Sequence, residues 1–366
     1  MINIEFIRKY ILCIYFFISV SNCLLSQDSL KKEGNLSWNV FVDVYYSYDF
    51  TNPANHEKAS FLYNHKRHNE VNINLALVNL SYNNSTKRAN LGLMAGTYPQ
   101  YNLAAEPELL RHIYEANVGI RITKNKEVWL DAGILPSHIG FETAISMNCW
   151  TLTRSILAEN SPYYETGVRA SYKTPNQKWY MAVMFLNGWQ RIIRVDGNNT
   201  PSFGTQITYT PTDKLSINSS TFIGNDKPDS VRKWRYFHNF YSTWQLSRFW
   251  GIIVGLDVGW EQKQRGSAEF NSWYSPVVII RYQNMNWAIA ARAEYYNDKN
   301  GSIVPLVNQY PFQMEGYSLN LDWTIYKGIM WRVEGRFFRN PTEYFSYQSS
   351  LSKSDFFFTT GLSFSF

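Results

Sequence analysis

Ser137, His138 and Glu142 are the residues whose types could support nucleophilic chemistry. A hydroxyl, an imidazole and a carboxylate lie within six residues of one another, as in the side-chain set of a hydrolase. A catalytic triad is defined by geometry, however, and neighbours on a loop rarely point at one another. The chain also lacks G-x-S-x-G, the motif that presents a serine nucleophile. We therefore expect no enzyme, and a barrel hydrolase is the least favoured alternative.

A metal site is the second chemical candidate. His56, His65 and His68 lie on one segment, and histidine is a common zinc ligand. Lys66 and Arg67 separate the last two and would repel a cation, and no cysteine or tight carboxylate pattern accompanies them. We expect a solvated loop here, with no metal and no cofactor.

Charged residues also recur at every second position of apolar segments. In 329–338, Arg332, Glu334 and Arg336 alternate with residues such as Val333 and Gly335. Period 2 predicts a β-strand with two different faces. In a membrane strand, such charges belong on a water-filled lumen side.

The same period recurs to the end of the chain, and it predicts about sixteen strands, within a range of about 14 to 18. They lie near 37–50, 70–83, 86–98, 112–123, 126–135, 163–173, 177–188, 201–210, 213–224, 232–246, 249–261, 272–283, 286–297, 312–325, 328–338 and 353–366. The second is the least regular, because its apolar phase changes near Val78, which a bulge would explain.

Short and long connections alternate between these segments. Tight turns rich in Asn, Pro and Ser alternate with long segments near 51–69, 99–111, 136–162, 189–200, 225–231, 262–271, 298–311 and 339–352. A β-sandwich would not sort its connections in this way. The pattern predicts an all-β fold, a transmembrane antiparallel up-and-down barrel with short periplasmic turns and long extracellular loops.

Composition agrees with such a barrel. The mean hydropathy of −0.33 excludes a bundle of transmembrane helices, whereas aromatic residues make up 17% of the chain. Residues 1–26 are predicted to be a signal peptide, with Arg8 and Lys9 before an apolar run, and residues 27–366 a single barrel domain. A lipoprotein box at Cys23 is disfavoured by Asn22. Cys149 is then the only mature cysteine, which excludes a disulfide framework.

Three stretches carry a resemblance to a known family. They are Gly133–Glu142 (GILPSHIGFE), Ala158–Glu165 (AENSPYYE) and Phe185–Ile192 (FLNGWQRI). Together with the alternating aromatic terminal strand, they resemble the outer-membrane β-barrel porin family of the OmpL-like, porin-2 type found in Gram-negative bacteria. The resemblance implies an outer-membrane barrel with a pore or transport role. Phe364 and the terminal Phe366 resemble the signal that the barrel-assembly machinery reads.

The segment 136–162 is the longest connection and the candidate constriction. Its charged and polar residues are His138, Glu142, Arg154 and Glu159, and they lie among large apolar side chains. A loop exposed to solvent rarely has so many. We predict that it folds into the barrel and narrows the pore, where fixed charges set selectivity. The alternative is a lid over the barrel mouth with no selectivity role.

Charges of both signs are predicted to face the lumen. They are Glu115, Arg121, Asp131, Glu165, Arg169, Arg281, Arg292, Glu294, Arg332, Glu334 and Arg336. Opposed bands would create a field across a wet pore, but cross-strand ion pairing is the favoured explanation for most of them. Their near balance does not decide between anions and cations.

Aromatic residues near strand ends are predicted to form interfacial girdles. They are Tyr45, Tyr46, Tyr48, Trp179, Trp189, Trp234, Trp244, Trp250, Trp260, Trp273 and Trp287. A sugar-stacking slide is the less favoured alternative.

The sequence thus predicts a porin-like channel for passive or weakly selective diffusion of small hydrophilic solutes or ions. The alternative from another class is a surface-interaction protein anchored by its barrel. Expected partners are outer-membrane lipid, lipopolysaccharide, the barrel-assembly machinery and the solutes, with a possible homo-oligomer. The net charge of +6 is mild and spread out, so we expect no nucleic acid.

Overall fold

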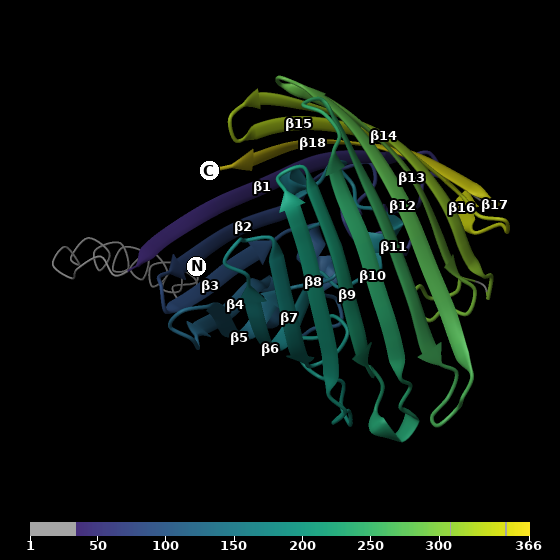
Figure 1. Ribbon diagram of the computed structural model, residues 1–366. Coiled ribbons are helices and arrows are strands. Elements are labelled where there is room, and N and C mark those ends of the chain that lie inside the picture. Colours follow the sequence, from purple (N-terminus) through teal and green to yellow (C-terminus); the bar gives the residue numbers. More distant parts are fainter. Residues whose placement is uncertain (1–33, 308, 348–349) are drawn as a thin grey trace, which may run out of the picture.

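A computed structural model describes residues 34–307, 309–347 and 350–366; the predicted signal peptide lies outside them. Sixteen antiparallel strands form a closed barrel (Figure 1), in the order β1-β18-β15-β14-β13-β12-β11-β10-β9-β8-β7-β6-β5-β4-β3-β2. The barrel strands are β1 (Asn35–Asp49), β2 (Val71–Asn83), β3 (Lys87–Ala95), β4 (Ile113–Arg121), β5 (Glu127–Pro136), β6 (Tyr164–Lys173), β7 (Trp179–Leu186), β8 (Ser202–Thr212), β9 (Leu215–Gly224), β10 (Arg235–Gln245), β11 (Trp250–Gln262), β12 (Phe270–Asn284), β13 (Trp287–Asp298), β14 (Phe312–Tyr326), β15 (Ile329–Arg339) and β18 (Ser354–Ser365).

The barrel closes between its first and last strands. β1 pairs with β18 in a register that runs from Phe41 opposite Ser365 to Asp49 opposite Phe357. Beyond that ladder, Val40 and Phe366 exchange backbone hydrogen bonds of 3.0 and 3.1 Å. Closure leaves no open sheet edge, which a spanning sheet requires because lipid offers no hydrogen-bond partner.

The period-2 pattern of the sequence separates the inner and outer faces. On β13, Ala290, Arg292 and Glu294 are buried, while Ile289 and Ala291 are exposed to the outside. The same alternation on neighbouring strands gives an apolar outer surface and a polar inner wall. The predicted strand class and the number of barrel strands are confirmed.

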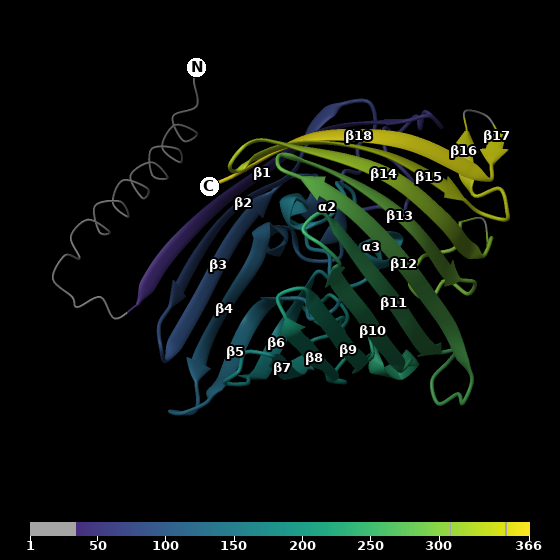
Figure 2. The ribbon, with the colours of Figure 1, turned by 45° about the horizontal axis from the view of Figure 1, so that its top comes forward.

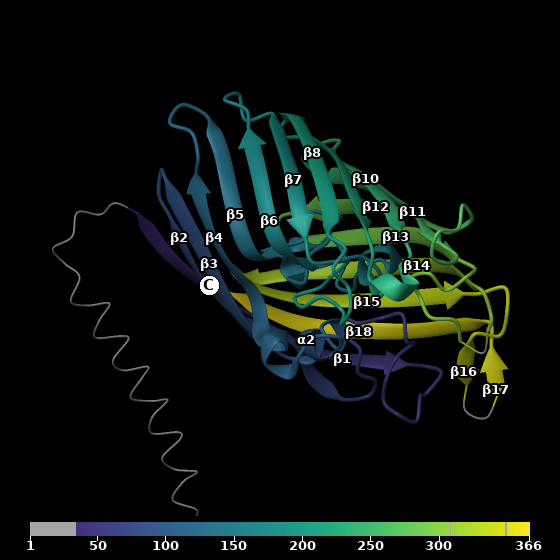
Figure 3. The same ribbon diagram turned by 90° about the horizontal axis from the view of Figure 1, so that it is seen from below.

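The connections sort to opposite ends of the barrel, which we call the turn end and the loop end. The turns between β2 and β3 or between β14 and β15 are short, whereas residues 50–70 and 137–163 are long loops. The loops also hold α2 (Thr97–Asn102), η1 (Glu108–His112), η2 (Ser146–Asn148), α3 (Ile156–Glu159), η3 (Asp229–Val231) and the hairpin β16 (Phe345–Tyr347) and β17 (Ser350–Ser352). Figure 3 shows this hairpin projecting from the loop end.

Loop segments occupy the interior of the barrel. Figure 2 looks into the ring and shows α2 and α3 inside it. A large apolar cluster joins Phe61 and Ile156 of two loops to inner-wall residues such as Phe312 and Phe338. Within the described ranges, no helix has the length and apolar character needed to cross a membrane.

The bulge predicted for β2 near Val78 is present, but it lies about four residues earlier. The register between β1 and β2 shifts at Asn74, where Asp43 faces Leu75 and Val44 faces Ile73. No such shift occurs at Val78. The apolar phase changes there because Leu75 and Leu77 are buried against α2 inside the barrel, while Val78 faces outward.

Three of the predicted girdle aromatics face the interior instead. Tyr45 is buried against His65, Trp273 belongs to the apolar cluster that contains Phe61, and Trp189 packs on Phe222 and Phe237. The girdle prediction is wrong for these three residues. The loops inside the barrel offer a surface on which aromatic rings of the inner face can pack. Residues such as Trp179 and Trp287 are exposed on the outer face.

Candidate functional site: the lumen and the loop that crosses it

The loop 137–163 leaves β5 and reaches the opposite wall of the barrel before it returns to β6. Its hydrogen-bond partners lie on β13, β14, β15 and β18, on the far side of the ring from β5 and β6. Ser146 lies 3.2 Å from the hydroxyl of Ser363, close to the turn end. The loop therefore penetrates most of the height of the barrel.

Thr153 anchors the loop on a buried cluster of charges. Its backbone N–H and its hydroxyl donate to the Glu334 carboxylate at 2.6 and 2.8 Å. Arg292 donates to the carbonyl of Thr153 at 2.9 Å and to Glu334 at 2.7 Å. A single threonine thus joins the loop to β13 and β15.

The charges of this cluster come from the loop and the inner wall together. Arg292 lies 3.3 Å from Glu294 and 3.9 Å from Glu142, and Arg336 lies 2.7 Å from Glu294. With Glu334, three carboxylates surround two guanidiniums. A folded protein tolerates charged groups this deeply buried only when they are paired and hydrogen-bonded. The loop and the wall therefore stabilise each other.

Arg332 makes a second anchor nearer the turn end. Its guanidinium donates to the carbonyls of Ser146 and Cys149 at 2.6 and 3.0 Å, and binds Asp322 on the next strand at 2.6 and 3.1 Å. Asn320 donates to Asp322 and accepts from the Leu152 N–H. The loop backbone is therefore satisfied by side chains of the wall.

Arg154 and Glu142 hold the loop in shape. Arg154 is fully buried and donates to the carbonyls of Thr143, Leu152 and Ala144 at 2.6, 2.6 and 3.0 Å. Glu142 accepts from the backbone and hydroxyl of Ser155. Burial raises the pKa of Glu142 above its ordinary value, although Arg292 opposes this.

Glu159 joins this loop to the first long loop, residues 50–70. Its carboxylate accepts from the backbone N–H groups of Tyr63 and Asn64 at 2.8 and 3.2 Å. The neighbouring Asn160 donates to the carbonyl of Phe61 at 3.3 Å. Burial raises the pKa of Glu159. The two loops thus form one packed unit inside the loop end.

His138 is locked into the wall. Its Nε2 lies 2.8 Å from the carbonyl oxygen of Thr221, which can only accept, so Nε2 carries a proton. Its Nδ1 lies 2.6 Å from Glu165. Burial alone would lower the pKa of His138, but the Glu165 carboxylate outweighs it and raises that pKa.

Two inner-face glycines make room for the rings of the loop. A Cβ on Gly204 of β8 would lie 2.8 Å from the His138 ring, and one on Gly251 of β11 would lie 2.6 Å from the Trp150 ring. Both contacts are closer than real Cβ atoms allow. The inner wall therefore has glycine at the two positions where rings of the loop occupy the space of a side chain.

The remaining predicted lumen charges lie on β4, β5, β6 and β12, and their ionic and hydrogen-bond partners lie outside the loop. Asp131 on β5 pairs with Arg88 and Arg169 at 2.5 and 3.2 Å. Glu115 accepts from Asn79 at 2.7 Å, and Arg121 donates to backbone carbonyls of the nearest turns. Arg281 lies 3.7 Å from Asp322. The pairing of Asp131 with Arg88 and Arg169 fits the favoured ion-pair explanation. Glu115 and Arg121 instead bond to neutral groups, and Arg281 only approaches Asp322.

The two chemical candidates of the sequence are not assembled. Ser137 accepts from the N–H of Ile139, and both nitrogens of the neighbouring His138 point to other partners. His65 contacts Asp43, whereas His68 accepts from the N–H of Asp49. Both rings are buried, so the prediction of a solvated loop is wrong here. Across the described residues, no group of three His, Cys, Asp or Glu is placed to hold a metal ion.

The family model described as "Putative beta-barrel porin-2, OmpL-like" matches residues 35–366. The chain belongs to this family. The match extends over all sixteen barrel strands and both inward-folded loops. The protein is therefore an integral outer-membrane β-barrel and a porin-like channel, with its turn end in the periplasm and its loop end outside the cell.

Solved structures agree with the fold of this porin. The outer-membrane channel DcaP of Acinetobacter baumannii has a TM-score of 0.60 at 14% identity, covering 92% of this chain and 99% of that one. The anion-selective porin from Comamonas acidovorans has a TM-score of 0.59 at 9% identity, covering 91% and 100%. Salmonella typhi OmpF, in complex with daunomycin, has a TM-score of 0.58 at 10% identity, covering 92% and 99%. No curated protein matches the sequence.

Several residues that position the loop of this porin were not singled out from the sequence. Thr153, Asn320 and Ser146 have ordinary types, and their partners lie far away in the chain. One signal was available: Phe61, Leu62 and Tyr63 make the first long loop unusually apolar. That pattern, like the one in 136–162, indicates a loop that folds inward.

Proposed function

We propose that this porin passes small hydrophilic solutes or ions, and that the loop 137–163 sets the bore. A sixteen-strand barrel is wide enough for an aqueous channel. The loop reduces that space because it crosses the lumen and is hydrogen-bonded to the far wall through Thr153 and Arg332. That crossing is the observation that carries the proposal.

Selection by size and charge needs no chemical step. In this proposal His138, Glu142, Arg154 and Glu159 act mainly by holding the constriction together, because all four are buried. Charges that remain in contact with solvent include two arginines on β3 and β6. Arg88 and Arg169 retain side-chain exposures of 29% and 20% beside a buried Asp131, so a mild preference for anions is expected there.

Planar-bilayer recording tests the proposal. Deleting Thr143 to Ser155 should raise single-channel conductance, and the reversal potential in a salt gradient should report anion preference. Unchanged conductance in a folded deletion variant would overturn the role of the loop. Because the deletion removes partners of Arg292 and Arg332, Trp150→Ala is the milder second variant, and it should raise conductance by a smaller amount.

The barrel-anchor alternative makes a different prediction. The apolar cluster that contains Phe61 and Ile156 fills part of the loop end, and an anchored surface protein could be plugged in this way. If neither the natural chain nor the loop deletion conducts, the anchor is the better description. A catalytic role has no support in the arrangement around Ser137 and His138, so we propose a channel that is not an enzyme.

The remaining partners follow from the surface of the barrel. Outer-membrane lipid and lipopolysaccharide would contact the exposed outer face, where residues such as Trp287 and Leu319 lie. The barrel-assembly machinery would read the strand that ends in Phe364 and Phe366. A homo-oligomer would use the same outer face.

A further inference from the structure

A polar pocket of about 450 Å³ opens at the periplasmic turn end of the lumen. It lies between the turns that join β10 to β11 and β12 to β13 and the inner face of β14. Arg248, Arg281, Gln283, Asn284, Asn286, Asp322 and Thr324 supply its polar side chains. Its volume is that of a small-molecule site.

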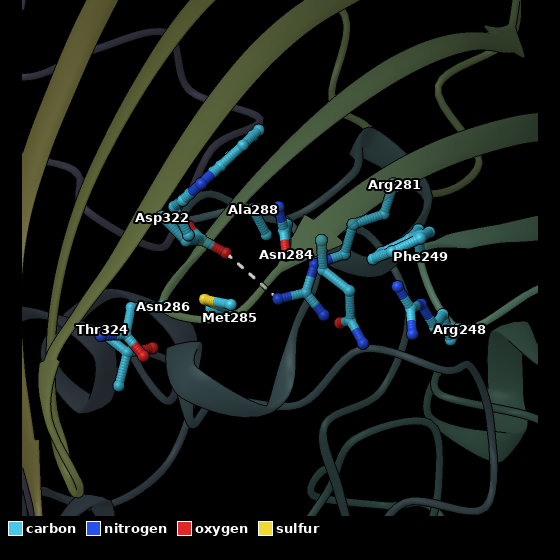
Figure 4. A pocket seen from close by; sticks show the side chains of 11 residues that line it. Arg248, Phe249, Arg281, Asn284, Met285, Asn286, Ala288, Asp322 and Thr324 are labelled. Carbon is cyan, nitrogen blue, oxygen red and sulfur yellow. Dashed lines mark ion pairs between the residues drawn. The ribbon is translucent and has the colours of Figure 1, made fainter.

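Among the described residues, two arginines of this pocket have weaker carboxylate contacts than Arg292, Arg332 and Arg336. Figure 4 shows Arg281 extending across the pocket toward Asp322, with Arg248 on the opposite side. The carboxylate oxygen closest to Arg281 belongs to Asp322 and is 3.7 Å away. The buried Nε of Arg281 has no hydrogen-bond partner within the described chain. Arg248 is exposed and stacks on Phe249, with its guanidinium carbon 4.3 Å from the ring centroid.

Asp322 offsets these charges only in part, because its carboxylate is shared with Arg332. One oxygen accepts from Arg332 and Asn320, both at 2.6 Å, and the other accepts from Arg332 at 3.1 Å. Asp322 and Arg332 thus form an ion pair. The charges of Arg248 and Arg281 remain in excess over the acidic side chains that line the pocket.

The constriction loop comes close to one wall of the pocket, at Arg281. Trp150 lies against Gly251, and its ring centroid is 5.9 Å from the Arg281 guanidinium. The pocket therefore offers guanidinium and amide donors near an aromatic ring. Planar guanidinium donors match the oxygens of a carboxylate or a phosphate.

We propose that this pocket binds the oxyanion group of a small solute, a carboxylate or a phosphate, at the periplasmic mouth of the channel. The inference deepens the proposed channel function and rests on it for its biological role. A solute bound to Arg281 would lie near Trp150 of the constriction loop, whose ring centroid is 5.9 Å from that guanidinium. The site would then hold an anionic solute near the narrow part of its path.

Binding can be measured without a conducting pore, by calorimetric titration of the folded barrel in detergent at low salt. The probes are inorganic phosphate and succinate, with glycerol as an uncharged comparison. Arg281→Gln and Arg248→Gln should each weaken binding of the preferred probe at least about tenfold, the loss expected for one charge-assisted contact. Lys327→Gln removes an equal charge from a neighbouring turn outside the pocket and should leave the affinity unchanged.

The outcomes separate this inference from the channel itself. Binding of succinate alone assigns a carboxylate, and binding of phosphate alone assigns a phosphate; both support the site if the arginine variants weaken it. No binding of either probe, or equal weakening by Lys327→Gln, overturns the site even if the channel conducts. Retained binding in a barrel that does not conduct would keep the site and overturn only the proposed channel. Arg248 lies in a turn, so its variant remains informative if Arg281→Gln fails to fold.

Discussion

Thr153 and Glu334 are 181 residues apart in sequence and are joined by two hydrogen bonds, from the backbone N–H at 2.6 Å and from the hydroxyl at 2.8 Å. The first residue belongs to the loop that crosses the lumen, and the second to the inner face of β15. Glu334 also binds Arg292 at 2.7 Å. A carboxylate of the wall therefore fixes the loop and neutralises a buried guanidinium at the same time.

Replacing Glu334 with Ala should release the loop and destabilise the barrel. The change leaves the buried Arg292 without its closest carboxylate, and breaking a buried pair of this kind costs about 3–5 kcal/mol. We expect a lower unfolding temperature and a larger, noisier single-channel current. Glu315→Ala is the matched control, because Glu315 lies on the outer face of β14 by its burial pattern. Equal currents in the two folded variants would contradict the anchoring role.

Glu159 should tolerate replacement by Gln but not by Ala. A Gln side chain still offers a carbonyl oxygen to the N–H groups of Tyr63 and Asn64, and burial already disfavours the charge of the carboxylate, as its raised pKa indicates. Alanine leaves buried N–H groups unpaired, at about 1–3 kcal/mol each.

Limited trypsin digestion reports this difference. The first long loop contains Lys58, Lys66 and Arg67, which are cleavable only when the loop leaves the barrel. Faster cleavage is expected in Glu159→Ala, and cleavage at the natural rate in Glu159→Gln. Rapid cleavage of both variants would mean that the negative charge itself is required.

The packing of the first long loop inside the barrel should become more stable as the pH rises from 7 to 9. Lys58 is buried with its Nζ 4.1 Å from the Phe357 ring centroid, and burial lowers the pKa of Lys58 to about 7, against the opposing charge of Asp49. In the released loop this pKa returns to about 10.4. Between these two pKa values, the loop packed inside the barrel binds fewer protons than the released loop. Raising the pH therefore favours the packed loop, by up to about 1.4 kcal/mol per pH unit.

A nitroxide at the exposed position 55, introduced as Asn55→Cys with Cys149→Ala, can follow this change. Its spectrum should show less motion at pH 9 than at pH 7. Lys58→Met should remove the pH dependence, because it keeps the side-chain length and loses the titrating group. The same pH response in the Lys58→Met protein would assign the effect to another residue.

The barrel could be predicted from the sequence because its signals are local. Alternation on β13 and β15 follows from neighbouring residues alone, and most turns carry Asn, Pro or Ser. The same local rule explains the errors. Leu75, Leu77 and Trp273 are apolar yet face inward, since the alternation rule assumes a wet lumen and these residues contact packed loops.

The candidate site could be predicted only in part from the sequence, for the same reason. The apolar residues of 136–162 indicated a loop that folds inward, but nothing near Thr153 in sequence points to Glu334, nor does anything near Ser146 point to Arg332. Such pairs depend on how far the loop reaches across the ring. The sequence therefore indicated which loop to consider, while its anchors required three-dimensional structure.

Ser137→Ala and His138→Ala should have different effects on stability, and this difference distinguishes a structural role of these residues from a catalytic one. The hydroxyl of Ser137 only accepts from the N–H of Ile139 at 3.1 Å, so its loss should leave stability and conductance nearly unchanged. Loss of the His138 ring removes bonds to Glu165 and to the Thr221 carbonyl, and should destabilise the barrel by about 2–4 kcal/mol. Ester hydrolysis that is present in the natural protein and abolished by Ser137→Ala would overturn this assignment.

Phe366→Ala should impair assembly in cells more than stability in detergent. The backbone of Phe366 pairs with Val40 at 3.0 and 3.1 Å, bonds that alanine retains, while the ring contacts Trp38 edge to face at 5.2 Å. An edge-to-face pair contributes about 0.5–1.5 kcal/mol, too little to unfold a closed barrel. We expect a marked fall in folded protein in the outer membrane, measured by heat-modifiable mobility, with nearly normal refolding of the purified chain. Phe366→Tyr keeps an aromatic terminus and should restore assembly. Equal losses in cells and in detergent would show that the ring acts at the β1–β18 seam rather than as an assembly signal.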